Sequence, residues 1–229
     1  MNDYLAKSRD LTNSLLLVIP VLVLYEAGLL LTRFEVLNGV DFLTIFLLRY
    51  FGLKGLLLFN LVLLATLIVA THLRQQRETF DTGLYPAVTA ESLLYAVALG
   101  AGLTFVLQKL PLAAATGFGP VTAVVLSLGA GVNEELVFRL VLFGGGTFFL
   151  AEVLGFERRT AVVLAALASS LMFSLAHYGA GGEVFQLASF TYRALAGLLF
   201  CGLYAMRGFA VAVYTHALYD ILVLVPPSL

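Results

Sequence analysis

The amino-acid sequence predicts an all-α fold, a polytopic bundle of about seven to eight transmembrane helices. Composition is the first reason: 61% of the 229 residues are hydrophobic and 12% are charged, which is not the balance of a soluble domain. The second reason is that the apolar residues form long runs, broken by short polar or glycine-rich segments. The formal net charge is −1 and no basic block occurs, so nucleic acid is not an expected partner.

The first half of the chain carries three predicted spans, at 15–31, 55–71 and 91–107, each about 17 residues long. The run at 15–31 is too long for the core of a signal peptide, and no small-residue cleavage site follows, so we expect it to be retained. A shorter apolar segment at 42–51 is predicted to be re-entrant or interfacial. If it spans instead, the bundle gains one helix and every later helix is inverted.

Polar features of this half suggest an orientation. The segment 72–86 is predicted to be a surface loop because it is the only long polar stretch. Glu91 is expected in the first turn of the third span, where the helix dipole favours an anion. The distribution of Lys and Arg among the breaks favours an N-terminus on the cytoplasmic side.

The second half carries four predicted spans, at 121–150, 161–178, 184–206 and 209–225. The triplet Gly144-Gly145-Gly146 is expected to weaken or bend the far end of the first of these helices. No internal repeat and no linker divides the chain.

The charged stretch Gly131-Val-Asn-Glu-Glu-Leu-Val-Phe-Arg139 is the centre of the prediction. A charge in the middle of a bilayer costs roughly 2.5–3.5 kcal/mol even on lenient scales, so its three ionisable groups must face a protein interior and find partners. Glu135 and Arg139 are spaced i,i+4 and share a helix face, so we expect them to pair. Glu134 is left without a cation nearby in sequence, which makes it a candidate general base.

Two histidines lie in apolar runs and complete the candidate site. His177 ends the span 161–178, and His216 lies one helical turn before Asp220, so that the last two share a face. We expect Glu134, His177, His216 and Asp220 to come together from three helices. Arg193, also within an apolar run, is a candidate to neutralise a neighbouring carboxylate.

These side chains are compatible with two kinds of hydrolysis. A carboxylate and imidazoles can activate a water and stabilise an oxyanion directly. Alternatively, Glu134, His177 and His216 could bind zinc as a His₂Glu set with an open fourth position. Serine catalysis is poorly supported because no G-x-S-x-G occurs. Ser169, Ser170 and Ser174 are instead expected to bond to backbone carbonyls or across helices.

Three motifs in this order resemble the CPBP family of intramembrane proteases, the CAAX-protease and bacteriocin-processing group also called Abi. They read Glu134-Glu135-Leu-Val-Phe-Arg139, Phe173-Ser-Leu-Ala-His177 and His216-Ala-Leu-Tyr-Asp220. The resemblance covers residues from roughly 120 to 225. It implies a CAAX-protease-like catalytic core over 120–229, whereas 1–119 would be membrane helices of unassigned role.

The resemblance also implies a function and roles for the site residues. The chain would be an endopeptidase that cuts a membrane-anchored protein or peptide. It would act in a bacterial or archaeal plasma membrane, either with a bound zinc ion or without a metal. Glu134 with His177 would activate the water, and His216 with residue 220 would stabilise the oxyanion. Glu135 and Arg139 would shape the site. Prenyl-protein processing relatives have Asn at this last position, and Asp220 can donate a hydrogen bond only when protonated.

Two other functions are compatible with a membrane bundle of this kind. One is a non-catalytic protein of the same fold, acting in bacteriocin immunity or as a scaffold. The other is an ion- or proton-coupled transporter with Glu134 and Arg139 as a relay, which the short chain without an evident inverted repeat disfavours. Substitution of Glu134 by Gln separates the protease from the scaffold, because only the protease needs the carboxylate.

Overall fold

The computed structural model of this chain is built of helices. It describes residues 2–32, 81–107, 119–178 and 184–225, together with isolated positions between 49 and 69. The predicted span at 55–71 and the short segment at 42–51 lie largely outside the described residues.

Within the described residues, five helices are long and apolar enough to cross a membrane, which makes this a multi-pass membrane protein. This number does not establish the predicted seven to eight spans. The last helix, α9 (Phe209–Leu224), is apolar but has only 16 residues. The five candidate spans are α2 (Leu11–Leu31), Leu84–Gly102 of α4 (Leu84–Leu107), the continuous helix Pro120–Val153, α7 (Arg158–Ala176) and α8 (Leu187–Arg207).

The predicted helices that fall within the described residues are present, with shifted ends. The polar N-terminus forms a separate helix, α1 (Asn2–Arg9), which hydropathy alone did not indicate. Asp10 separates it from α2 by accepting a hydrogen bond from the Asn13 backbone N–H at 3.0 Å, which caps the first turn of α2. Gly208 separates α8 from α9. Its φ of 86° favours glycine, and a Cβ added at this position would lie 3.1 Å from the Arg9 Cα.

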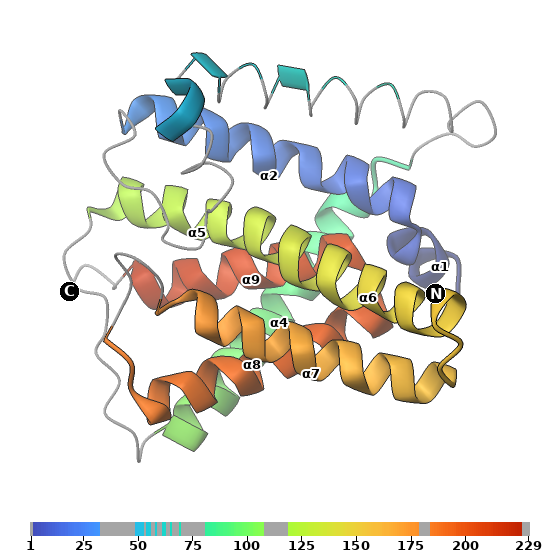
Figure 1. Ribbon diagram of the computed structural model, residues 1–229. Coiled ribbons are helices and arrows are strands. Elements are labelled where there is room, and N and C mark those ends of the chain that lie inside the picture. Colours follow the sequence, from blue (N-terminus) through green and yellow to red (C-terminus); the bar gives the residue numbers. More distant parts are fainter. Residues whose placement is uncertain are drawn as a thin grey trace.

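The helix α9 forms the centre of the bundle. It contacts α2, α4, α5 (Pro120–Glu134) and α8, and residues Ala210 to Val213 are fully buried. In Figure 1 α9 lies next to α5 in the middle of the molecule. A helix buried on all sides needs no polar face, which agrees with its uniformly apolar N-terminal half.

Close approach of α5 to α9 depends on Gly131. A Cβ at this position would lie 2.8 Å from the Ala217 Cβ and 2.9 Å from the Val213 carbonyl oxygen. Small residues let membrane helices pack closely, and here the contact lies one turn before Glu134 and Glu135. The two carboxylates are therefore carried directly against α9.

The helix that contains the charged stretch runs on past its glycine triplet, so the predicted weakening or bending at the triplet does not end the helix. It continues from Pro120 to Val153, and its turns widen into π-helix over η1 (Glu135–Gly145) and η2 (Phe149–Val153), with α6 (Gly146–Phe148) between them. The Ser169 hydroxyl of α7 donates a 2.5 Å hydrogen bond to the Phe138 carbonyl inside this widened part. Widened turns of this kind occur frequently at functional sites.

The prediction for Glu91 was wrong. The helix α4 begins at Leu84, where the Asp81 carboxylate accepts from the Gly83 N–H at 3.0 Å, so Glu91 lies well inside the helix. Its carboxylate accepts two hydrogen bonds from Arg207, at 2.5 and 2.8 Å. Such bidentate pairs are among the stronger polar contacts in proteins.

This ion pair also fastens α1 to the bundle. Arg207 donates to the Ser8 hydroxyl at 3.0 Å, and the Tyr4 hydroxyl donates to Glu91 at 2.5 Å. Burial, together with the hydrogen bond to Glu91, raises the pKa of Tyr4 to about 12. The N-terminal helix is thus held by a charged network at the α8–α9 turn.

Candidate active site

The two glutamates of the charged stretch are buried side by side against α9. Glu134 is the last residue of α5 and is 3% exposed, and Glu135 opens η1 and is fully buried. Both carboxylates approach His216, so the contact between α5 and α9 defines the site. The charged stretch therefore lies against the His216 motif, as predicted.

Glu135 fixes the orientation of His216. The His216 Nδ1 lies 2.6 Å from Glu135 Oε1, and since a carboxylate is the acceptor, the imidazole donates its Nδ1–H. The other ring nitrogen, Nε2, faces Glu134 Oε2 at 3.6 Å and Asp220 Oδ2 at 3.7 Å. His216 and Asp220 thus share a face as predicted, and Nε2 is the atom of His216 that points to both remaining carboxylates.

The predicted ion pair between Glu135 and Arg139 is confirmed. Arg139 Nη1 lies 3.1 Å from the same Glu135 oxygen that His216 contacts, and both side chains are fully buried. Glu135 therefore links a buried guanidinium to a buried imidazole. Removing charges from water is costly, and it is offset here by close pairing and by aromatic neighbours.

Aromatic rings surround this pair. The Arg139 guanidinium lies over Phe173 at 4.3 Å and over Phe200 at 5.2 Å from the ring centroids, in cation–π contact. Phe200 also stacks on His216, with centroids 4.8 Å apart and ring planes at 29°. Phe173 belongs to one of the three sequence motifs, but Phe200 lies in an apolar run and gave no signal. Only the folded contact shows that it holds His216.

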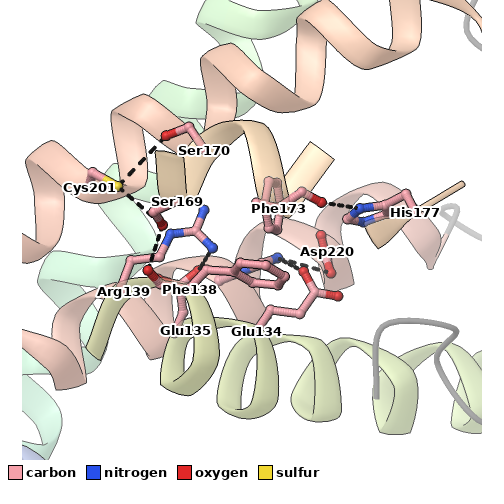
Figure 2. Close-up of polar contacts among 11 residues, drawn as sticks. Glu134, Glu135, Phe138, Arg139, Ser169, Ser170, Phe173, His177, Cys201 and Asp220 are labelled. Carbon is pink, nitrogen blue, oxygen red and sulfur yellow. Dashed lines mark hydrogen bonds and ion pairs between the residues drawn. The ribbon is translucent and has the colours of Figure 1, made fainter. Parts of the chain in front are cut away.

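His177 approaches from the end of α7. Its Nδ1 lies 2.8 Å from the Phe173 carbonyl oxygen, one turn earlier, so the Nδ1–H donates and the neutral imidazole carries its lone pair at Nε2. The imidazole packs edge-on against the Phe173 ring at 5.0 Å. Figure 2 shows the Phe173 ring between Arg139 and His177, with Glu134 and Asp220 on the same side of the site as His177.

Access to the site is from the side of His177 and Asp220. The Asp220 side chain is 22% exposed and His177 is half-buried, whereas Glu135 and Arg139 are inaccessible. Glu134 and His216 retain 3% and 5% exposure, and His177 and Asp220 are the more accessible groups of the site.

The three serines of α7 behave as predicted. Ser169 donates to the Phe138 carbonyl, Ser170 to the Ala166 carbonyl at 2.7 Å, and Ser174 to the Phe190 carbonyl at 2.7 Å. Each hydroxyl is used for helix packing. Their contacts give no support to a serine nucleophile.

A zinc site needs three ligand atoms within about 2.0–2.2 Å of one point. In the part of the chain that the structure describes, no group of three or more His, Cys, Asp or Glu side chains is arranged to hold a metal ion. The predicted zinc set of Glu134, His177 and His216 is thus not assembled in this arrangement.

Comparison with known proteins adds a family. Residues 116–222 match the model of the family described as Type II CAAX prenyl endopeptidase Rce1-like. The matched segment contains all three motifs of the candidate site and confirms the resemblance that they indicated. Comparisons with curated proteins and with solved structures gave no match.

Proposed function

Because residues 116–222 form a domain of the Rce1-like CAAX endopeptidase family, we propose that this membrane protein is an intramembrane endopeptidase. Its substrate would be a membrane-anchored protein or peptide, cut near the C-terminus. Membership of a protease family supports hydrolysis of a peptide bond. The residues assigned below, the position of the cut and the anchored substrate are our proposal.

The observation that carries the proposal is the placement of Glu134. Its carboxylate is 3% exposed, and its Oε2 lies 3.6 Å from His216 Nε2, too far for a direct hydrogen bond. Asp220 Oδ2 lies 3.7 Å from the same nitrogen. A water between these groups could donate a hydrogen bond to a carboxylate and accept one from a protonated His216 Nε2, as a hydrolytic water requires.

In the proposed reaction Glu134 accepts a proton from the water while the water oxygen attacks the carbonyl carbon of the substrate. His177, with Nδ1–H engaged by the Phe173 carbonyl, presents Nε2 to the same water. The new C–O bond converts the carbonyl into a tetrahedral oxyanion. When the C–N bond breaks, the proton held by Glu134 passes to the leaving amine.

His216 is assigned to the oxyanion. With Nδ1–H donated to Glu135, its protonated form offers a second N–H at Nε2, on the side that faces Glu134. Asp220 as a carboxylate cannot donate, so we assign it to orient His216 and the water rather than to bind the oxyanion. Glu135 and Arg139 position His216 and do not touch the substrate.

The test is cleavage of lipid-anchored peptides by the purified chain in detergent, with products identified by mass spectrometry. We expect the wild type to cut at one bond near the C-terminus and His177→Ala to lose the activity. His72→Ala, a histidine in the polar segment 72–86, is the matched control and should retain it. No cleavage by folded wild type, or equal cleavage by His177→Ala, would favour the non-catalytic alternative.

A further inference from the structure

Two tyrosine hydroxyls meet beside the candidate active site, where α8 packs against α9. The Tyr192 hydroxyl of α8 contacts the Tyr219 hydroxyl of α9, and both side chains are half-buried. Tyr219 directly precedes Asp220, so the contact lies at the turn of α9 that carries the last residue of the site. Neither tyrosine has a part in the proton transfers proposed for Glu134 and His177.

The helix α8 holds this turn of α9 at two points. Phe200 stacks on His216 with ring centroids 4.8 Å apart, and Tyr192 contacts Tyr219, less than one turn further along α9. Tyr192 and Phe200 are eight residues apart, which is roughly 12 Å along a helix. The turn that carries both His216 and Asp220 is therefore attached to α8 near each of its ends.

Neighbouring elements fix the position of the hydroxyl pair. The Tyr219 ring lies against α4, because a Cβ added at Gly100 would be 3.9 Å from its Cε2 atom, an ordinary van der Waals distance. On the α8 side, the next residue, Arg193, donates to the hydroxyls of Ser189 at 2.6 Å and Tyr178 at 3.2 Å, which attaches this turn of α8 to the end of α7. Side chains supported in this way hold their polar atoms in a defined place.

The pair has one hydrogen more than its own contact uses. Two tyrosine hydroxyls carry two hydrogens, and the hydrogen bond between them takes one. The second hydrogen needs an acceptor, since a polar group without one costs free energy inside a protein. Among the described residues, Asp220 carries a carboxylate whose charge acts on both hydroxyls. A hydroxyl that already accepts a hydrogen bond also becomes a stronger donor.

We infer that Tyr192 and Tyr219 are positioning residues, whose hydroxyl pair directs its second hydrogen to the Asp220 carboxylate, directly or through one water, and holds it beside His216. This inference rests on the proposed function, because it assumes that Asp220 orients His216 and the water. Asp220 Oδ2 lies 3.7 Å from His216 Nε2, and a shift of this carboxylate would displace both groups from their reactive geometry. Neither tyrosine touches the substrate or exchanges a proton with it.

Phenylalanine substitutions in the full-length chain test the pair, because they remove a hydroxyl and keep the ring. For a cleaved lipid-anchored peptide, Tyr192→Phe and Tyr219→Phe should each lower kcat about tenfold and leave KM within about twofold, since the lost hydrogen bond serves a charged group. The double variant should lose no more than about the same factor, because the two hydroxyls act as a unit. Tyr214→Phe is the matched control on α9. Its hydroxyl donates to the Leu17 carbonyl at 2.8 Å, away from the site, and kcat should be unchanged.

Asp220→Asn distinguishes a role at this carboxylate from simple packing of the two rings. In the Asp220→Asn background the charge is absent, so Tyr219→Phe should change kcat by less than about twofold, whereas a tyrosine that only packs would lower it as in the wild type. Thermal unfolding in detergent of the same four proteins gives a second cycle that needs no activity. The two substitutions should be non-additive in Tm as well.

The outcomes separate the inference from the proposed function. Unchanged kcat in Tyr192→Phe and Tyr219→Phe, or additive effects of Tyr219→Phe and Asp220→Asn on kcat or on Tm, overturn the inference and leave the proposed function intact. If the folded wild type cuts no lipid-anchored peptide, the proposed function fails, and the positioning role fails with it.

Discussion

The Nδ1 of His216 lies 2.6 Å from Oε1 of Glu135, and the same oxygen lies 3.1 Å from Arg139 Nη1. One buried carboxylate oxygen therefore serves both an imidazole and a guanidinium. This sharing divides the two adjacent glutamates into different roles. Glu135 holds the Nδ1 side of His216, and Glu134 lies on its Nε2 side, where we propose that the reaction takes place.

Glu135→Gln should destabilise the protein strongly. The amide keeps the volume but removes the charge, which leaves Arg139 as an unpaired buried cation at a cost of about 3–5 kcal/mol. Thermal unfolding in detergent measures the loss. The double variant Glu135→Gln/Arg139→Met removes both charges and should recover much of the stability. A double variant no more stable than the single would show that the pair is not the stabilising unit.

Gly131→Ala should reduce activity by separating α5 from α9. The added methyl group would lie 2.8 Å from Ala217 Cβ and 2.9 Å from the Val213 carbonyl, so the helices must move apart, at a cost of about 1–3 kcal/mol. Peptide cleavage and thermal unfolding measure both effects. Gly202→Ala in α8 is the control, since its Cβ would meet no atom within 4 Å. Equal effects of both substitutions would contradict the role assigned to this contact.

Phe200→Leu tests the ring that stacks on His216. Leucine fills much of the space but gives up the stacking at 4.8 Å and the cation–π contact with Arg139 at 5.2 Å. Since such contacts contribute about 0.5–1.5 kcal/mol each, we expect kcat to fall about tenfold with a smaller change in KM. Phe148→Leu, at an exposed ring on the same long helix as Glu134, is the control. Unchanged kcat in Phe200→Leu would assign this ring to packing alone.

Tyr4 gives the fold a pH dependence on the alkaline side. Its pKa is raised to about 12, whereas an unfolded tyrosine titrates near 10, so the folded state favours the protonated hydroxyl. This stabilisation is complete below about pH 10 and is lost as the pH rises from there to about 12. The difference in Tm between wild type and Tyr4→Phe should therefore change over this pH window and stay constant below it. A constant difference across the window would show that Tyr4 does not titrate with unfolding.

The local parts of the site followed from the sequence. The pairs Glu135–Arg139 and His216–Asp220 are each spaced i,i+4, so helical geometry alone predicts that they share a face. Charged residues are also easy to identify in the sequence of a membrane helix, because they interrupt an apolar run. These two facts were sufficient to select the residues that the structure brings together at α5 and α9, whereas His177, at the end of α7, is linked to His216 through the Phe173 ring.

Partners that are distant in the chain were not predictable in this way. Arg207 pairs with Glu91 across the bundle, and no local pattern indicates it. Phe200 stacks on His216, but nothing in the sequence of an apolar helix distinguishes this phenylalanine from its neighbours. The widened turns from Glu135 arise where the long helix packs against α7, so they too depend on tertiary contacts. Only the folded arrangement supplies this information.

The central claim is that the Glu134 carboxylate activates the hydrolytic water, and Glu134→Gln tests it most directly. The measurement is kcat/KM for a cleaved lipid-anchored peptide, alongside Glu152→Gln, an exposed carboxylate on the same continuous helix. General-base catalysis contributes about 10²–10⁴-fold, so we predict a loss of this size for Glu134→Gln and none for Glu152→Gln. A folded Glu134→Gln protein that cleaves within a few-fold of the wild type would contradict the account.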